Sequence, residues 1–303
     1  MSILAGYLPS WAMALDGAGK SPQTSISYLD SVKRLDRFLV GKGLPLGAPA
    51  IRAFLSAERE RTSAWSAQKH YRNLHVFFGW AMKEGDILDA DPMINVQKPQ
   101  AAAEAKPFFT EADLAALLRA TQGQDFESRR DHALLRVLVD TGMRVGGLAG
   151  LRFHPTDDAM TDVFLAQRRL RIRLKGGDAW WVPVGARSCV AIDRYLRVRA
   201  RHPQAPSPWL WLGTRGRGLD HFTDSGIRQM LARRGETAGV QHCHPHKFRG
   251  TMADQWLADG GTIDDLMTIA GWKSITMPLR YAAGRKIARA AEAHRRLSPG
   301  DRL

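Results

Sequence analysis

The chain is poor in cysteine, in long apolar runs and, relative to its bases, in acidic side chains. Two cysteines, Cys189 and Cys243, occur among 303 residues, too few for a disulfide framework, which favours a reducing cytoplasm. No apolar run approaches the roughly 20 residues that a membrane-spanning helix needs. The N-terminus lacks a basic segment, and Pro9 and Asp16 interrupt its apolar residues, so it does not resemble a signal peptide. We expect a cytoplasmic protein.

Acidic residues are outnumbered along the whole chain, with 44 Lys and Arg against 30 Asp and Glu and a formal net charge of +14. The excess is uneven. Residues 1–106 hold 13 bases and 10 acids, which is +3, and the remainder therefore carries +11 of the +14. A basic excess bears on partners rather than on fold. It favours nucleic acid first and an anionic membrane surface second, with most of the attraction for phosphates in the later part of the chain.

Apolar residues recur at three- and four-residue steps in the first hundred residues, the period of amphipathic helices. One helix is predicted around 28–39, ending at Gly41 and Gly43. A shorter helix follows around 51–55, and a third covers 65–81 and ends near residue 85. Its aromatic stripe predicts core packing. Basic side chains lie between the apolar ones, on faces that are either solvated or turned towards DNA: Lys33, Arg34, Arg37, Lys69 and Arg72.

Residues 98–107 have the composition of a linker, because two prolines bracket an alanine-rich polar stretch with no apolar face. Thr110 then begins a new helix, with Asp113 three residues on as a weaker form of the capping box. We therefore expect an all-α N-terminal domain over 1–97 and a second domain over 108–303.

The second domain combines helices with a short strand-like section. Residues 169–174 alternate charged and apolar side chains, the period of a half-buried strand. Residues 175–178 supply turn chemistry, and 179–184 form the predicted returning strand, with Pro183 near its end. Helices are expected at 114–120, 129–140, 190–200, 225–234, 245–259, 263–270 and 285–297. The predicted fold class is mainly α with a small antiparallel β-sheet: an α+β domain that follows an all-α one.

Transfer of a phosphodiester without a metal needs a nucleophile, cationic donors for the non-bridging oxygens and an acid for the departing sugar oxygen. Arginine suits the second role because its planar fork makes two parallel bonds to a phosphate. His246 and Arg249 are three residues apart. On a helix that begins at Pro245, both would project from one face near an N-terminus that favours an anion. Alone, this pair is a weak signal.

Residues 141–152 are Thr-Gly-Met-Arg-Val-Gly-Gly-Leu-Ala-Gly-Leu-Arg, with an arginine soon after a Thr-Gly turn. Lys175 follows in the turn between the two predicted strands. Residues 271–281 are Gly-Trp-Lys-Ser-Ile-Thr-Met-Pro-Leu-Arg-Tyr and place Trp272 nine residues before Tyr281. In this order, and together with the His-x-x-Arg spacing, these segments resemble the boxes of the tyrosine recombinase (phage integrase) family.

In that family a helix ends at Thr-Gly and an arginine opens the next helix, a lysine lies in a β-hairpin, and a His or Trp precedes the nucleophilic tyrosine by nine residues. Order and spacing agree across roughly residues 130–285, and the helical N-terminal part resembles the family's core-binding domain more loosely. The resemblance implies two domains that clamp duplex DNA, joined near 98–107. It also implies cutting and rejoining of DNA without a metal, ATP or another cofactor.

The resemblance gives each matching residue a role. Tyr281 would attack the scissile phosphate, which yields a 3′-phosphotyrosyl link and a free 5′-hydroxyl, and rejoining would reverse this step. Arg144 and Arg249 would hold the non-bridging oxygens. Lys175 would act as general acid for the 5′-oxygen. His246 would serve as base or proton shuttle near the tyrosine. Trp272 would donate its N–H to a phosphate oxygen.

Two positions depart from the commoner family pattern. Histidine is more frequent where Trp272 stands, and an indole donates a hydrogen bond but cannot relay a proton. Packing as a core aromatic is the alternative for this residue. The family often has an acid three residues after Arg144, where this chain has Gly147. Another group, such as a backbone carbonyl, must then take that part.

Three other functions stay open. Residues 242–246 hold four potential metal ligands in five positions, although no second cluster lies at a known zinc spacing. A DNA-binding protein of the same fold that had lost catalysis would not need to keep all the matching residues. A type IB topoisomerase shares the chemistry but relaxes DNA as a monomer. The size of the N-terminal domain and the His-x-x-Arg spacing favour recombination.

The expected partner is a double-stranded DNA recombination site. In the family the C-terminal segment, here 285–297, often docks on the neighbouring subunit. The chain would then act as a homo-tetramer on two DNA sites and pass through a four-way (Holliday) junction, whereas packing on its own domain is the alternative. We expect a monomer or weak association in the free state, and an accessory directionality factor is compatible with this. Integration, excision and dimer resolution use the same residues, so the sequence does not separate them.

Overall fold

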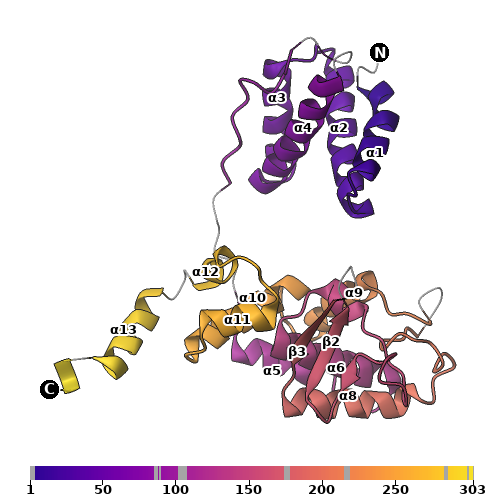
Figure 1. Cartoon of the computed structure of the whole chain (residues 1–303), viewed down its shortest axis with the longest axis vertical. Coiled ribbons are helices and arrows are strands. Elements are labelled where there is room, and N and C mark those ends of the chain that lie inside the picture. The colour runs from indigo at the N-terminus through magenta and orange to yellow at the C-terminus, as the bar shows by residue number, and fades with distance from the viewer. Residues whose placement is uncertain are drawn as a thin grey trace. The chain divides into compact units, whose positions relative to one another are not determined.

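The computed structural model describes residues 4–84, 88, 90–101, 108–173, 178–214, 219–282, 286–298 and 300–302. Two compact units divide the chain, Met1–Glu104 and Ala105–Leu303, and Figure 1 shows the helices and strands of each. No described helix is long and apolar enough to cross a bilayer. The identity of the first unit as a core-binding domain stays a prediction.

The first unit is a group of helices around one apolar core. After a short 3₁₀ turn (η1, Ala5–Tyr7) come α1 (Leu8–Gly17), α2 (Pro22–Lys42), α3 (Ala48–Arg61) and α4 (Ala64–Glu84). The side chain of Ser21 caps α2, and the helix ends at Gly43 in a left-handed conformation. Gly41 lies inside α2, so the prediction that it stops the helix was wrong. The predicted aromatic core is confirmed for Phe77 and Phe78 but not for Trp65, which is exposed.

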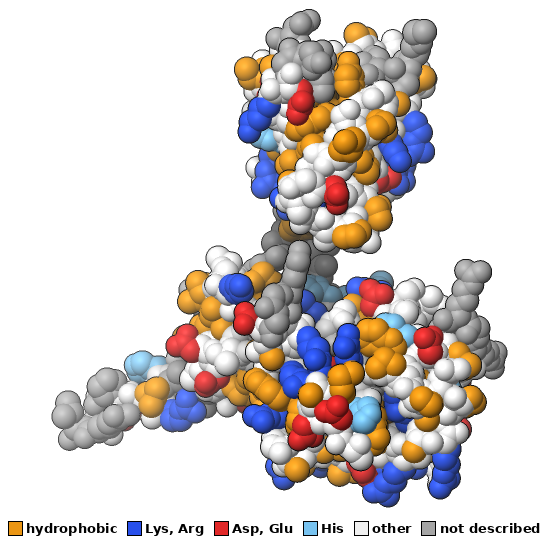
Figure 2. Space-filling model, turned by 45° about the vertical axis from the view of Figure 1, so that its right-hand side comes forward, with side chains coloured by type: hydrophobic (Ala, Val, Ile, Leu, Met, Phe, Trp, Pro, Cys, Tyr) orange, Lys and Arg blue, Asp and Glu red, His pale blue; other side chains and the backbone are white. Residues whose placement is uncertain are grey.

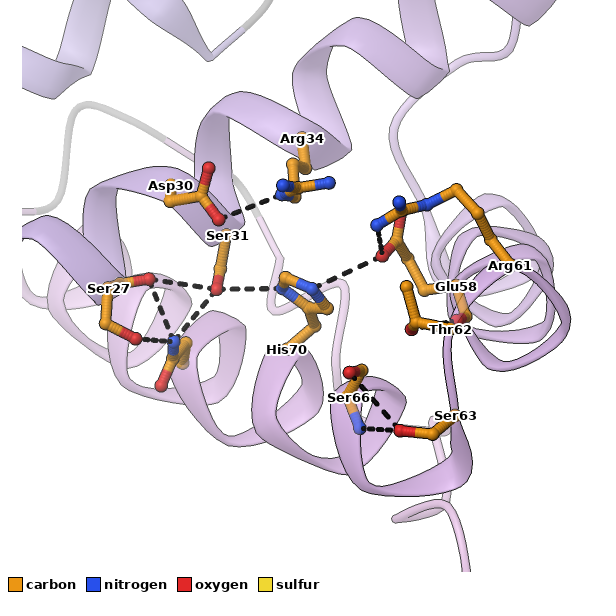
Figure 3. Close-up of polar contacts among 11 residues, drawn as sticks. Ser27, Asp30, Ser31, Arg34, Glu58, Arg61, Thr62, Ser63, Ser66 and His70 are labelled. Carbon is orange, nitrogen blue, oxygen red and sulfur yellow. Dashed lines mark hydrogen bonds and ion pairs between the residues drawn. The ribbon is translucent and has the colours of Figure 1, made fainter. Parts of the chain in front are cut away.

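A buried polar cluster joins three helices of this unit (Figure 3). His70 of α4 bonds through Nδ1 with the Ser31 hydroxyl at 2.9 Å, and its Nε2 lies 3.4 Å from a carboxylate oxygen of Glu58. Asn73, one turn further along α4, donates to Ser31 and to the backbone carbonyl of Ser27. Because buried polar groups are costly unless paired, these bonds fix α2, α3 and α4 in one arrangement.

The second unit is mainly helical and contains one three-stranded sheet. Its helices are α5 (Glu111–Arg119), α6 (Phe126–Thr141), α7 (Val145–Ala149), α8 (Ala186–Arg199), α9 (Asp224–Thr237), α10 (Pro245–Ala258), α11 (Ile263–Ala270), α12 (Thr276–Ala282) and α13 (Lys286–Leu297), with a final 3₁₀ turn at Gly300–Arg302 (η4). The predicted fold class is confirmed. Helix α1, the short length of α7, helix α12 and strand β1 were not predicted from the sequence.

The sheet has the order β1 (Val163–Phe164), β2 (Arg169–Arg173), β3 (Ala179–Pro183), with both pairs antiparallel. The predicted alternation holds on β2, where Leu170 and Ile172 are buried. Helices α6 and α8 pack together against this core. At the start of the unit, Thr110 and Asp113 form a complete reciprocal capping box, stronger than the sequence pattern alone indicated.

Candidate active site

Arg249 lies at the centre of the candidate site, in the second turn of α10, and is only 4% exposed. Its guanidinium donates to two backbone carbonyls, Gly142 at 2.9 Å and Ala270 at 2.6 Å. These carbonyls belong to the C-terminal ends of α6 and α11. A helix C-terminus carries partial negative charge, so two helices stabilise this buried cation.

Glycines make both of those helix ends possible. Gly142 ends α6 and Gly271 ends α11, each with a positive φ, +54° and +61°. This left-handed conformation favours glycine. A Cβ at position 142 would lie only 3.0 Å from Cα of Arg249. The Thr-Gly turn of the sequence therefore has a physical reason: it lets α10 approach the end of α6 closely enough for Arg249 to reach its carbonyl.

Burial and a neighbouring cation both act on Arg249. Desolvation lowers its pKa most, the charge of Arg144 lowers it further, and Tyr281 opposes the change, so the pKa falls to about 10. The group stays charged at neutral pH. Arg144 itself is the N-cap residue of α7, is exposed and makes no capping bond with its side chain. Two neighbouring cations, one buried and one exposed, form an arrangement that an anion would stabilise.

Tyr281 of α12 stands beside this pair. Its ring stacks on Trp272, with centroids 5.5 Å apart and an interplanar angle of 11°, and its hydroxyl lies 3.4 Å from Nε2 of His246. The guanidinium carbon of Arg249 is 4.6 Å from the centroid of the same indole ring. The structure thus brings together Tyr281, His246, Trp272, Arg249 and Arg144. Lys175, the sixth predicted residue, lies outside the described residues.

The indole N–H of Trp272 is buried and has no hydrogen-bond partner in the part of the chain that the structure describes. The residue is also 5% exposed and packs with Met252, Leu266 and Ala270. It therefore has the packing of a core aromatic and still keeps an unused donor. The predicted bond from this N–H to a phosphate oxygen stays a prediction.

Gly250 and Phe108, two residues that the sequence pattern did not single out, complete the surroundings of Tyr281. A Cβ at position 250 would lie 3.1 Å from Cε1 of Tyr281 and 3.2 Å from Cε1 of Phe108. A glycine inside a helix is unfavourable by about 1 kcal/mol relative to alanine, and this close packing explains it. A cavity of about 240 Å³ adjoins the tyrosine and is lined by Phe108, His242, His244, His246, Lys247, Gly250 and Tyr281.

The histidine-rich segment does not form a metal centre within the described ranges, which contain no suitable group of three ligands. Cys243 is buried, and burial raises the pKa of its thiol to about 12, whereas a metal binds the thiolate. His244 instead caps α10, because its Nδ1 accepts a bond from the Lys247 backbone N–H. The segment thus shapes the helix start and one wall of the cavity beside Tyr281.

Gly147 lies on α7 with its missing side chain directed at β2. A Cβ there would be 3.7 Å from two side-chain carbons of Ile172. An acidic side chain at this position would begin against an apolar neighbour. The groups that hold Arg249 are instead the backbone carbonyls of Gly142 and Ala270.

The basic residues singled out in the first unit lie on α2 and α4. Lys33, Arg37 and Arg72 are exposed. Arg34 donates to the Asp30 carboxylate at 2.9 Å. Burial would raise the pKa of Asp30, but this bond, the charge of Arg34 and that of Lys69 lower it overall. Arg34 and Lys69 therefore share one acidic neighbour across the two helices, and their contact with DNA stays a prediction.

Exposed Lys and Arg side chains occur on both units, and several gather on the face of the second unit that Figure 2 shows. This is the unit that holds the larger share of the positive charge in the sequence. A basic surface of this kind attracts phosphates over a distance.

Comparison with known proteins gives a family match over residues 107–286, described as the phage integrase family. Among curated proteins, the tyrosine recombinase XerC of Bacillus licheniformis is 26% identical over 271 residues, which cover 86% of this chain and 86% of that protein. XerC of Oceanobacillus iheyensis is 27% identical over 271 residues, covering 86% of this chain and 85% of its own length.

Solved structures share the fold at lower identity. A XerH site-specific recombinase bound to a palindromic difH substrate, in a post-cleavage complex, superposes with a TM-score of 0.72 at 15% identity, covering 91% of this chain and 80% of that one. A lambda integrase dimer (residues 75–356) bound to a COC′ core site gives 0.69 at 17% identity, with 90% and 96% covered.

Proposed function

This chain belongs to the phage integrase family and is a tyrosine recombinase, and we propose that Tyr281 is the residue through which it cuts and rejoins DNA at a specific site. The family match covers more than half of the chain. The observation that carries the proposal is the position of the tyrosine: its hydroxyl faces His246, and its ring stacks on Trp272, whose indole also contacts Arg249.

The proposed reaction is a transfer of one phosphodiester bond. The Tyr281 oxygen attacks the scissile phosphorus, a bond from phosphorus to the tyrosine oxygen forms, and the bond to the 5′-oxygen breaks. The DNA is left with a 3′-phosphotyrosyl link and a free 5′-hydroxyl. Because one phosphodiester replaces another, rejoining is the same step in reverse with a 5′-hydroxyl as the nucleophile, and needs no ATP.

Each neighbouring group contributes at a stated atom. His246 Nε2, 3.4 Å from the tyrosine oxygen, accepts the phenolic proton as the oxygen attacks. Arg249 and Arg144 donate to the non-bridging oxygens, whose charge grows in the transition state. Trp272 donates its unused N–H to the same phosphate. Lys175 protonates the departing 5′-oxygen. Burial lowers the Arg249 pKa most and repulsion by Arg144 lowers it further. In this proposal the phosphate relieves that repulsion.

We further propose that the chain acts as a homo-tetramer on two double-stranded sites, and that it is a monomer or weakly associated when free. Support comes from one related structure, described as a lambda integrase tetramer bound to a Holliday junction. The first unit would contact DNA through Lys33, Arg34, Arg37, Lys69 and Arg72. Since such contacts release counterions, the affinity should fall steeply with salt. The same proposal places the protein at the nucleoid in the cytoplasm and allows for an accessory directionality factor.

The decisive experiment is covalent trapping on a nicked DNA library. Duplexes carry a fixed nick flanked by randomised sequence, so that cleavage near the nick releases a short oligonucleotide and prevents rejoining. Wild-type protein, Tyr281→Phe and Tyr71→Phe are incubated with the library and denatured, and the DNA that stays attached to protein is measured and sequenced. Tyr71 is a half-buried residue of α4 and serves as the matched control.

We expect wild type and Tyr71→Phe to retain DNA and Tyr281→Phe to retain none. An adduct in Tyr281→Phe would show that another residue is the nucleophile. Absence of an adduct from wild type across the library would refute cleavage and favour a silent DNA-binding protein of the same fold. The recovered sequences also identify the DNA site.

A further inference from the structure

The turn from α11 into Trp272 is held by side chains from two other parts of the unit. Gly271 and Trp272 form a Schellman motif at this helix end: the Gly271 N–H bonds to the Thr268 carbonyl, and the Trp272 N–H bonds to the Met267 carbonyl at 2.9 Å. The Ala270 carbonyl accepts from Arg249. The same turn therefore supports the buried arginine and begins the segment that stacks on the tyrosine.

Trp180 of β3 buttresses this turn. Its indole N–H donates to the Thr268 carbonyl at 2.9 Å. A Cβ at Gly271 would lie 3.0 to 3.1 Å from three atoms of the Trp180 six-membered ring, Cη2, Cζ2 and Cζ3. Gly271 is thus required twice, once by its positive φ and once by the ring packed against it.

The strand provides an internal control in the next residue. Trp180 pairs with Ile172, on the face of the sheet that buries Leu170 and Val182. Trp181 points to the opposite face, is 37% exposed, and lies under the guanidinium of Arg169 at 4.1 Å. The two adjacent tryptophans lie on opposite faces of the strand. Trp180 packs on the core and contacts the α11 turn, whereas Trp181 packs with Arg169 on the other face of the sheet and does not contact that turn.

We propose that Trp180 is a positioning residue for DNA cleavage, which acts through the Gly271–Trp272 turn on Arg249 and Tyr281. This rests on the proposed function, in which Tyr281 attacks the phosphate and Arg249 holds it. Helix α11 and strand β3 pack together, so the buttress ties the sheet to the site. Without it, the Ala270 carbonyl and the Trp272 ring are free to shift, and both contact Arg249. Shifts of about 1 Å are enough to slow catalysis about 100-fold.

The test measures single-turnover cleavage at saturating protein on the DNA site that gives the strongest wild-type adduct. The variants are Trp180→Ala, Trp180→Phe and the matched Trp181→Ala. Trp180→Phe keeps an aromatic ring but loses the N–H donor and the outer ring atoms that touch Gly271. DNA affinity and melting temperature are measured for each variant, so that a folding defect is seen separately.

We expect Trp180→Ala to slow cleavage roughly 10- to 100-fold with unchanged DNA affinity, and Trp180→Phe to fall between this variant and wild type. Trp181→Ala should stay within about 2-fold of wild type, as expected for a surface substitution away from the site. Equal rates for the Trp180 and Trp181 variants would overturn the inference.

A second substrate separates positioning from a general loss of structure. A methylphosphonate at the scissile position replaces one non-bridging oxygen with a methyl group and removes the charge that Arg249 would neutralise. If Trp180 acts through Arg249, the defect of Trp180→Ala should be several-fold smaller on this substrate. The same defect on both substrates would show that Trp180 does not act through Arg249 and would overturn the inference. If wild type forms no Tyr281 adduct, the proposed function itself is refuted. If wild type forms the adduct and the Trp180 variants cleave like wild type, only the role of Trp180 is refuted.

Discussion

The two units each contain a histidine within a polar cluster, and the clusters differ in whether their polar groups are paired. In the first unit both ring nitrogens of His70 face partners (Figure 3). Asn73 donates to Ser31 and to the Ser27 carbonyl. In the second unit the indole N–H of Trp272 has no partner in the described ranges. The same cluster contains Arg249, whose pKa is lowered by burial and by the charge of Arg144.

This difference separates a cluster that stabilises the fold from one suited to a ligand. A paired buried network rigidifies the helices that contribute to it. An unpaired buried donor is unfavourable by about 1–3 kcal/mol, and neighbouring like charges add to this. Perturbed ionisable groups gather at functional sites, and here the unpaired donor lies beside such a group, Arg249. The expected consequence is that substitutions in the second cluster impair chemistry, whereas substitutions in the first impair stability.

The largest effect is expected from the two arginines. Arg144→Ala and Arg249→Ala should each slow cleavage by about 100- to 1,000-fold, because one donor to developing charge is removed. Their melting temperatures should differ. Arg144 is exposed, so its variant should melt like wild type, whereas Arg249→Ala leaves the Gly142 and Ala270 carbonyls without their donor and should melt lower.

Single-turnover cleavage, DNA affinity and thermal melting together check this prediction. Affinity should change little for Arg144→Ala, since many other phosphate contacts remain. A variant that lost binding and kept its cleavage rate per bound complex would instead place that arginine among the docking residues.

Most of the second unit could be predicted from the sequence because its signals are local. Periodicity identified α6, α8 and α10, and alternation identified β2 and β3. The resemblance to the tyrosine recombinase family identified the residues that the fold brings together around Tyr281, whereas the spacing of His246 and Arg249 alone was a weak signal. The elements of this unit that were missed lacked such signals: α12 is seven residues long and has Pro278 at its third position, and the strand β1 has only two residues.

The supporting residues of the site could not be predicted in the same way, because their roles depend on contacts between distant segments. Gly250 shows only as a glycine inside a helix until Tyr281 and Phe108 are seen to pack on it. Trp180 shows only as a strand residue until its N–H is found on Thr268, 88 positions later. The buried polar cluster around His70 could not be predicted either. It joins three helices through polar side chains of types that usually lie on the surface.

Disrupting the buried polar cluster around His70 should mainly affect stability. Asn73→Ala removes the donor to Ser31 and Ser27 from a buried position, and we expect a loss of about 1–3 kcal/mol in the free energy of unfolding. His75→Ala, an exposed position on the same helix, is the matched control and should stay within about 0.5 kcal/mol. Denaturant unfolding measures both.

Cleavage should be spared at the same time. At a temperature where Asn73→Ala is folded, its single-turnover rate at saturating protein should equal that of wild type. A lower rate with normal stability would contradict the division between the two clusters.

The smallest effect should be the pH dependence that His70 contributes to stability. Burial, followed by the charge of Lys69, lowers the pKa of this histidine below its ordinary 6.5, although Glu58 opposes the change. The unfolded chain therefore binds a proton near pH 6.5 that the folded unit does not yet bind. Stability should fall as the pH drops from about 6.5 towards the lower folded pKa, and it should be unaffected by this group above that range. Denaturant unfolding of wild type and His70→Gln between pH 7 and pH 5 measures the contribution as the difference between the two proteins. Wild type should lose more stability over this interval than the variant, because glutamine does not titrate. Parallel curves for the two proteins would show that the paired network does not exclude the proton.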